Sequence, residues 1–143
     1  MELNKCNLSI EFYFNDIDNQ IMSVEILPQG EQGVVISKTG VYIYRKEITL
    51  PTKVSLKFTN KNLQCDTILD ETGKIIKDKS VIIQHISIDG IPISIIYLKN
   101  HLKIITDDQR EVYSNYVGFN GEMLLDFDCA NVFLQMMKFN RLI

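Results

Sequence analysis

The chain has 143 residues, of which 45% are hydrophobic and 23% are charged, and its formal net charge is -3. A chain of about 150 residues fits one domain and can bury a substantial hydrophobic core. The composition is also far from that of disordered or collagen-like chains. The negative net charge argues against nucleic-acid binding, because recognition of phosphate requires a local surplus of Lys and Arg.

The apolar residues are rich in β-branched side chains, with 21 Ile and 9 Val against a single Ala. β-branched residues favour strands, whereas Ala favours helices. No apolar run reaches the roughly 18 residues that span a bilayer, and the first residues lack the basic and hydrophobic segments of a secretory signal. We therefore expect a β-rich protein that is synthesised in the cytosol and has no membrane partner.

Apolar and polar residues alternate from Cys6 to Phe14. This alternation predicts a half-buried strand, because successive side chains of a strand point to opposite faces. Polar residues 15–20 then form a turn and an extended pattern resumes at 21–27, so we predict a first hairpin. Further strands are predicted at 33–37, 41–50, 54–59, 67–69, 74–76, 81–88, 91–98, 101–106, 111–113 and 123–128.

The run from Asp70 to Lys74 is a strong turn signal, with Gly73 placed to accept a positive φ. It predicts a short hairpin between the strands on its two sides. Lys74, Lys77 and Lys79 follow one another closely along this segment. We expect them to be solvated residues of a strand edge, where Lys opposes aggregation, and not a nucleic-acid-binding patch.

Residues 81–88 carry apolar side chains at both odd and even positions. A strand of this kind is covered on both faces, which predicts a central place in its sheet. We expect Ile82 and Ile86 to face one layer and Ile83 and His85 to face the other.

The complete pattern comprises about ten short strands at intervals of roughly 8 to 12 residues, without a convincing helix. Residues 113–121 are predicted to form a loop, and residues 132–139 fit either a final strand or a helix. The predicted fold class is all-β. Residues 1–143 are expected to form a single domain, a β-sandwich or a barrel of short antiparallel strands.

Residues that could carry catalysis are sparse. His85 and His101 occur without a G-x-S-x-G motif or a Cys in catalytic surroundings, and no glycine-rich phosphate loop is present. Asp126 and Asp128 project from one face of a predicted strand, as the carboxylates of a glycosidase could. Adjacent acids are also common on exposed strands. We predict that the protein is not an enzyme, and a glycosidase at these two Asp residues is the alternative.

Metal binding has only loose support in the sequence. The three cysteines are far apart and lack the paired spacing of a zinc site, so we expect them to be reduced and buried. Calcium needs six to eight oxygen ligands, which the acidic loops of a sandwich can supply. We predict no required cofactor, and the candidate ligands for calcium are Asp66, Asp70 and Asp78. The alternative is that these carboxylates belong to turns and strand edges.

The stretch from residue 113 to residue 121 combines aromatic rings with amide side chains. Its candidate contact residues are Tyr113, Asn115, Tyr116, Phe119 and Asn120. Flat apolar faces beside hydrogen-bonding amides are suited to gripping sugars or protein partners. The alternative is a packed loop whose aromatic rings close one end of the core.

Five segments combine turn signals with alternating strands: Leu50–Phe58, Cys65–Thr67, Asp70–Lys79, Ile86–Ile91 and Tyr116–Gly121. These segments resemble small β-sandwich proteins of tailed bacteriophages, and more generally jelly-roll carbohydrate-binding modules of the calcium-dependent kind. The resemblance implies a single jelly-roll-like β-sandwich domain. The resemblance covers about two thirds of the chain. The sequence departs from the sugar-binding pattern because it has no Trp, and Asp66 and Asp78 match calcium ligands only approximately.

The resemblance implies a non-enzymatic structural and interaction module of a phage virion, such as a capsid decoration or a neck, baseplate or tail-fibre accessory. Its partners would be neighbouring virion proteins in a homo- or hetero-oligomeric assembly, and its location the virion. The alternative is a carbohydrate-binding module that recognises a cell-surface glycan, with or without calcium.

Overall fold

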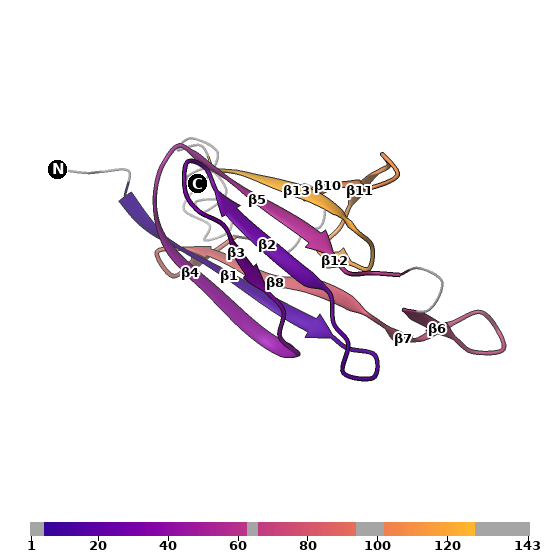
Figure 1. The fold of residues 1–143 in the computed structure, drawn as a ribbon. Coiled ribbons are helices and arrows are strands. Elements are labelled where there is room, and N and C mark those ends of the chain that lie inside the picture. The colour runs from indigo at the N-terminus through magenta and orange to yellow at the C-terminus, as the bar shows by residue number, and fades with distance from the viewer. Residues whose placement is uncertain (1–4, 63–65, 94–101, 128–143) are drawn as a thin grey trace, which may run out of the picture.

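Two antiparallel β-sheets face each other in the computed structural model, which describes residues 5–62, 66–93 and 102–127 (Figure 1). One sheet, here called the β1 sheet, has the strand order β12 (Tyr116–Val117), β8 (Ser80–Ile88), β1 (Lys5–Asn15) and β4 (Gly40–Thr49), with β9 (Ile91–Pro92) also paired to β8. The other, the β5 sheet, has the order β11 (Glu111–Tyr113), β10 (Lys103–Thr106), β13 (Gly121–Phe127), β5 (Thr52–Thr59), β2 (Ser23–Pro28) and β3 (Val34–Ile36). A hairpin of β6 (Thr67–Leu69) and β7 (Ile75–Asp78) projects from one end of the sandwich.

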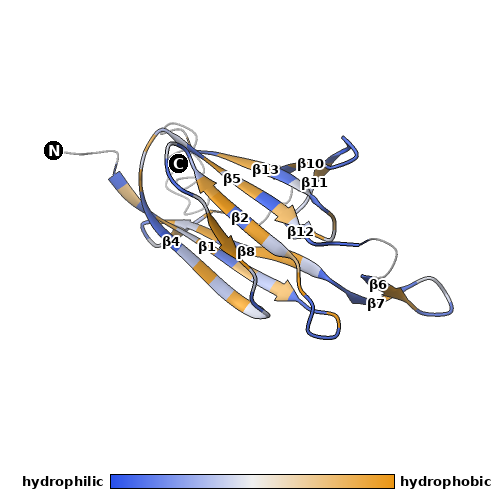
Figure 2. Ribbon diagram, viewed as in Figure 1, coloured by the Kyte–Doolittle hydropathy of each residue, from blue (hydrophilic) through white to orange (hydrophobic). Residues whose placement is uncertain are grey.

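The predicted all-β sandwich is therefore confirmed. Strand β1 shows how the alternating sequence produces this fold. Every second residue from Cys6 to Phe14 is buried, and the residues between them are at least partly exposed. Strand β13 alternates in the same way. The alternation is visible as bands of apolar and polar residues along the strands (Figure 2).

The core fills the space between the two sheets, and both sheets contribute to it. Its largest fully buried side chains are Leu8, Ile10, Phe12, Phe14, Met22, Ile26, Leu56, Phe58, Ile83, Ile86 and Ile104. Burial of one such side chain stabilises the fold by about 1.5–3 kcal/mol. Within the described ranges, no helix has the length and apolar character that crossing a membrane requires.

The predicted hairpin between the first two strands is wrong. Strand β1 pairs with β4 and β8, whereas β2 pairs with β3 and β5 in the other sheet. A tight turn does follow β1, with Asp18 and Asn19 at φ 51° and 65° and Ile17 bridged to Gln20. This turn carries the chain from one sheet to the other, so that β1 and β2 both turn their apolar sides toward the core instead of lying side by side.

The hairpin at Gly73 and the central position of β8 are confirmed, since β8 lies between β12 and β1. The predicted facing of β8 is wrong, however. The pairing register shifts between Glu11 and Phe12, and Ile83 and Ile86 are both buried while His85 is exposed. A bulge of this kind changes which face the following side chains reach.

Other predictions differ from the structure or lie outside it. The predicted loop contains the short strand β12, which is paired to β8. Residues 132–139, most of 91–98, His101 and Asp128 lie outside the described residues, as do two of the three cysteines. Cys6, the described cysteine, is buried, as expected.

We predict that Phe58→Ala lowers the free energy of unfolding by about 3–5 kcal/mol, because the ring is fully buried between the sheets and its removal leaves a cavity. Urea denaturation followed by circular dichroism measures this change. Its control is Lys57→Ala, on the exposed face of the same strand, for which we expect a change below about 0.5 kcal/mol. Equal losses in the two variants would contradict the assigned core.

Candidate functional site

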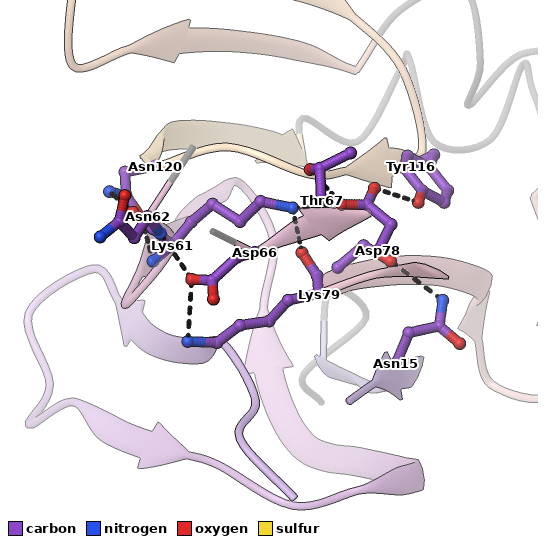
Figure 3. Close-up of polar contacts among 10 residues, drawn as sticks. Asn15, Lys61, Asn62, Asp66, Thr67, Asp78, Lys79, Tyr116 and Asn120 are labelled. Atoms are coloured by element: carbon purple, nitrogen blue, oxygen red, sulfur yellow. Dashed lines mark hydrogen bonds and ion pairs between the residues drawn. The ribbon is translucent and has the colours of Figure 1, made fainter. Parts of the chain in front are cut away.

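Polar side chains gather at the end of the sandwich from which the β6–β7 hairpin projects (Figure 3). Lys61 and Asp66 come from the connection between β5 and β6, and Asp78 and Lys79 from the end of β7. We call these four residues the lysine–aspartate cluster. Two further residues, Tyr116 on β12 and Asn120 before β13, connect the cluster to the far part of the chain.

Both lysines of the cluster are buried with their charges compensated. The Lys61 side chain is 0% exposed, and its ammonium donates to the Asp78 carboxylate and to the Lys79 carbonyl. The Lys79 ammonium lies 3.3 Å from Asp66 Oδ2. A buried charge is tolerated only when a partner and hydrogen bonds replace its hydration. The two pairs therefore fasten the β5–β6 connection to the end of β7.

The prediction that Lys74, Lys77 and Lys79 are all solvated residues of a strand edge is correct for only two of the three. Lys74 and Lys77 are exposed, but the Lys79 residue is 3% exposed. Its backbone N–H also donates to the Asp66 carbonyl at 2.9 Å. The preference of Lys for solvent is overridden here because Asp66 is brought to it by the loop after β5.

Asp78 also fixes the position of an aromatic ring. Its carboxylate accepts hydrogen bonds from the Tyr116 hydroxyl and, at 2.8 Å, from the Thr67 hydroxyl. Burial raises the pKa of the Tyr116 phenol above its usual value, and the hydrogen bond to Asp78 raises it further. The phenol is therefore held in its protonated, donating form. Gly118 leaves room for this arrangement, since a Cβ there would lie 3.0 Å from Asp78 Oδ2 and 3.4 Å from the Tyr116 ring.

A cavity of about 470 Å³ lies against Tyr116, and we call it the end pocket. Its lining residues come from the turn after β1, from β7 and from β12: Asn15, Asp16, Asp18, Ile75, Lys77, Asp78 and Tyr116. Together they present carboxylates, an amide, an ammonium group and a phenol ring around one space. This mixture suits a ligand with several hydroxyl groups and an apolar face.

Some residues of this lining are held by hydrogen bonds within the chain, and others can still contact a ligand. The Asn15 amide donates to Ser80 Oγ at 2.9 Å, and Asp16 accepts from the Asn19 backbone at 3.2 Å. Within the described part of the chain, no ion pair or side-chain hydrogen bond engages Asp18 or Lys77. These two charged groups can therefore turn toward a ligand, while the turn and the tyrosine stay in place.

An apolar row leads from the end pocket across the outer face of the β1 sheet. The pairing register places Tyr116 opposite Ile82, Ile82 opposite Tyr13 and Tyr13 opposite Val41. Residues that are directly opposite share a face, so the four side chains form a line across four strands. Val41 is 49% exposed and Tyr116 is 39% exposed. We call this line the outer row.

The residues predicted for the aromatic loop lie on both sheets and in the connections between their strands. Tyr113 lies at the end of β11 in the β5 sheet, whereas Tyr116 lies in the β1 sheet. Phe119 is partly buried and packs against the core, which matches the alternative of a loop that closes the core. Asn115 donates to the Ile83 carbonyl, and Asn120 exchanges two hydrogen bonds with the Lys61 backbone. Of the five predicted residues, only Tyr116 lines the end pocket.

Each of the candidate calcium ligands already contacts other groups of the chain. Asp66 and Asp78 compensate the buried lysines, and Asp70 binds Thr72 and the Lys74 N–H within the β6–β7 turn. These hydrogen bonds lower the pKa of Asp70 below its usual value, the one from the Thr72 hydroxyl most. No group of three or more His, Cys, Asp or Glu side chains that could hold a metal ion occurs among the described residues.

Of the residues considered for catalysis, His85 and Asp126 are described, and both lie on the surface. His85 is exposed on β8, with its Nε2 3.8 Å from Glu11 Oε2. Asp126 is exposed on β13, opposite Lys53. Asp128, its companion in the glycosidase alternative, lies outside the described residues, so that alternative stays untested.

Two solved structures of carbohydrate-binding modules are similar to this chain. One, described as "vCBM60 in complex with galactobiose", has a TM-score of 0.52 and 16% identity over 84% of this chain and 97% of that chain. The other, a vCBM60 form described with "two families of calcium-dependent carbohydrate binding modules", has a TM-score of 0.52 and 15% identity over 85% of this chain and 90% of that chain. No family model and no curated protein matches the sequence.

These comparisons confirm the jelly-roll-like fold and the general resemblance to carbohydrate-binding modules. Neither structure is described as a virion protein. The virion role, its protein partners and the virion location therefore stay predictions without support from the comparisons. Calcium, which the second description names, does not fit Asp66 and Asp78, because lysine ammonium groups already compensate their charges.

We predict that Lys61→Met lowers the free energy of unfolding by about 3–5 kcal/mol, since it leaves Asp78 without its charged partner in a buried setting. Chemical denaturation measures the loss. Lys77→Met removes a lysine from the same end of the sandwich but from an exposed position, and we expect a change within about 0.5 kcal/mol. A loss in Lys61→Met no larger than that of the control would show that the pair is not structurally important.

Proposed function

We propose that this chain is a non-catalytic carbohydrate-binding module and that the end pocket, with the outer row beside it, is its ligand site. The observation that carries this proposal is the tyrosine ring held by Asp78 at the edge of a pocket lined by carboxylates, an amide and an ammonium group. The likeness of the fold to two carbohydrate-binding modules supports it.

The chemistry of the pocket matches that of a sugar. A pyranose ring has an apolar face of C–H groups, which packs on a flat aromatic ring, and hydroxyl groups at its rim. Carboxylate and amide oxygens accept hydrogen bonds from such hydroxyls, and ammonium groups donate to them. Tyr116 supplies the flat surface, and Asp18 and Lys77 supply an acceptor and donors on the other sides of the pocket.

The pocket is also organised before a ligand arrives. The Tyr116 hydroxyl is bound to Asp78, and Asp78 is itself held by Lys61 and Thr67. A ring fixed in advance loses little conformational entropy on binding, so more of the contact energy appears as affinity. The buried cluster thus serves the site by positioning its aromatic surface.

Galactobiose, the sugar bound by one of the similar structures, is the first ligand to test. We predict that Tyr116→Ala weakens binding of the recognised glycan at least about tenfold, since loss of the ring removes the main apolar contact and one tenfold step corresponds to about 1.4 kcal/mol. A glycan array that contains galactobiose, followed by calorimetric titration of the hits, measures this change.

Tyr113→Ala is the matched control for this experiment. Tyr113 is 54% exposed and lies three residues away in sequence, but it belongs to the β5 sheet. We expect its removal to leave the affinity unchanged. Equal effects of the two substitutions, or an array without any glycan bound by the wild-type chain, would contradict the proposed function.

A further prediction concerns calcium. Lysine ammonium groups already compensate Asp66 and Asp78, so we expect neither folding nor glycan binding to need the ion. Melting temperature and glycan affinity should be the same in 5 mM EDTA and in 5 mM calcium chloride, where ligand linkage would stabilise a calcium-binding fold measurably (about 2.7 kcal/mol at 100 times the Kd). Loss of binding in EDTA that calcium restores would contradict this expectation.

A further inference from the structure

A second cavity lies on the same face of the β1 sheet as the outer row, toward the other ends of β1 and β8. It measures about 480 Å³, and its lining residues are Asn7, Leu8, Ser9, Arg45, Lys46, Glu47, Ser87 and Gly90. Ser9 stands opposite Arg45 on one side and opposite Ser87 on the other. Two hydroxyls and a guanidinium group therefore lie in one row across three strands.

Arg45 is the charged lining residue of this cavity that has no ionic partner in the described part of the chain. Lys46 binds Glu31 at 2.7 Å, and that hydrogen bond raises the pKa of Lys46 above its usual value. Glu47 lies 3.5 Å from Lys5. The Arg45 side chain is exposed and keeps all five of its N–H donors for a ligand. A guanidinium group binds planar or tetrahedral oxyanions with paired hydrogen bonds.

The two cavities are joined by a continuous surface. Tyr13 of the outer row and Ser9 of the Arg45 row lie on the same face of β1, four residues apart. At about 3.3 Å per residue, the two rows are roughly 13 Å apart. Ile43, Glu11 and His85 form the row between them. A chain of linked sugars that occupies the end pocket can therefore extend along this face to Arg45.

We propose that Arg45, with Ser9 and Ser87, forms a second subsite that binds the anionic group of an acidic glycan. This inference rests on the proposed function and gives it a ligand class: an extended polysaccharide with a carboxylate or a sulfate several sugar units away from the ring held by Tyr116. Ser9 and Ser87 bind hydroxyls beside the anionic group. Lys46 and Glu47 stay in their ion pairs at the rim of the subsite.

The test compares ligands that share one sugar chain and differ in whether that chain carries anionic groups. Oligogalacturonate and its methyl ester have the same sugar chain, and the ester lacks the negative charges. Calorimetric titration should show that the wild-type chain binds the acid at least about tenfold more tightly than the ester, since a charge-assisted pair is worth more than a neutral contact. A sulfated galactan oligosaccharide and its desulfated form separate sulfate from carboxylate as the recognised group.

The variant Arg45→Gln should bind the acidic ligand at least about tenfold more weakly and the neutral ligand as the wild type does, whereas Arg45→Lys should keep part of the affinity. Lys57→Gln is the matched control, because it removes one positive charge from the exposed face of the β5 sheet. Equal losses in Arg45→Gln and Lys57→Gln would overturn the subsite and indicate a general effect of net charge.

Other outcomes distinguish this inference from the proposed function. Binding of neutral galactobiose without any preference for the acidic ligands would overturn the subsite and leave the proposed function intact. Failure of the wild-type chain to bind acidic or neutral oligosaccharides would overturn both. Circular dichroism spectra of the variants check that each one folds.

Discussion

The hydrogen bonds that the Asp78 carboxylate accepts hold together the end of the sandwich from which the β6–β7 hairpin projects. The carboxylate accepts hydrogen bonds from Lys61 after β5, from Thr67 on β6 and from Tyr116 on β12. Segments from both halves of the sequence therefore meet at one partly buried charge. Because an uncompensated carboxylate is costly in this setting, folding has to bring its partners together. The same contacts that close the sandwich also fix the ring at the edge of the end pocket.

Lysine performs here a role that a metal ion can perform in an acidic loop region. Two ammonium groups enter from neighbouring segments, each compensates one carboxylate, and each is bound covalently to the chain. Such an arrangement needs no ion from solution. Among the described residues the candidate ligands Asp66, Asp70 and Asp78 form no metal cluster, and Asp66 and Asp78 are each paired with a lysine instead.

Much of the fold could be predicted from local pattern, but its long-range arrangement could not. The period of two in β1 and the turn at Gly73 are local signals, and both were interpreted correctly. The turn after β1 gives no indication of whether its flanking strands pair, and they lie in different sheets. Lys79 was expected in solvent because lysine usually is; only the approach of Asp66 buries it. Tyr116 was predicted as a contact residue. Tyr13, Ile82 and Arg45 lie on the same face of the sheet because of the pairing register of the strands, which cannot be derived from the local sequence pattern.

Glycan binding by the outer face of the β1 sheet can be followed residue by residue with two-dimensional amide NMR of the chain during titration with the glycan that it binds best. We expect chemical-shift changes to concentrate at Tyr13, Ile82 and Tyr116 and in the turn at Asp18, while the outer face of the β5 sheet around Leu124 is unaffected. Changes centred on the β5 sheet, or none at saturating ligand, would contradict this expectation.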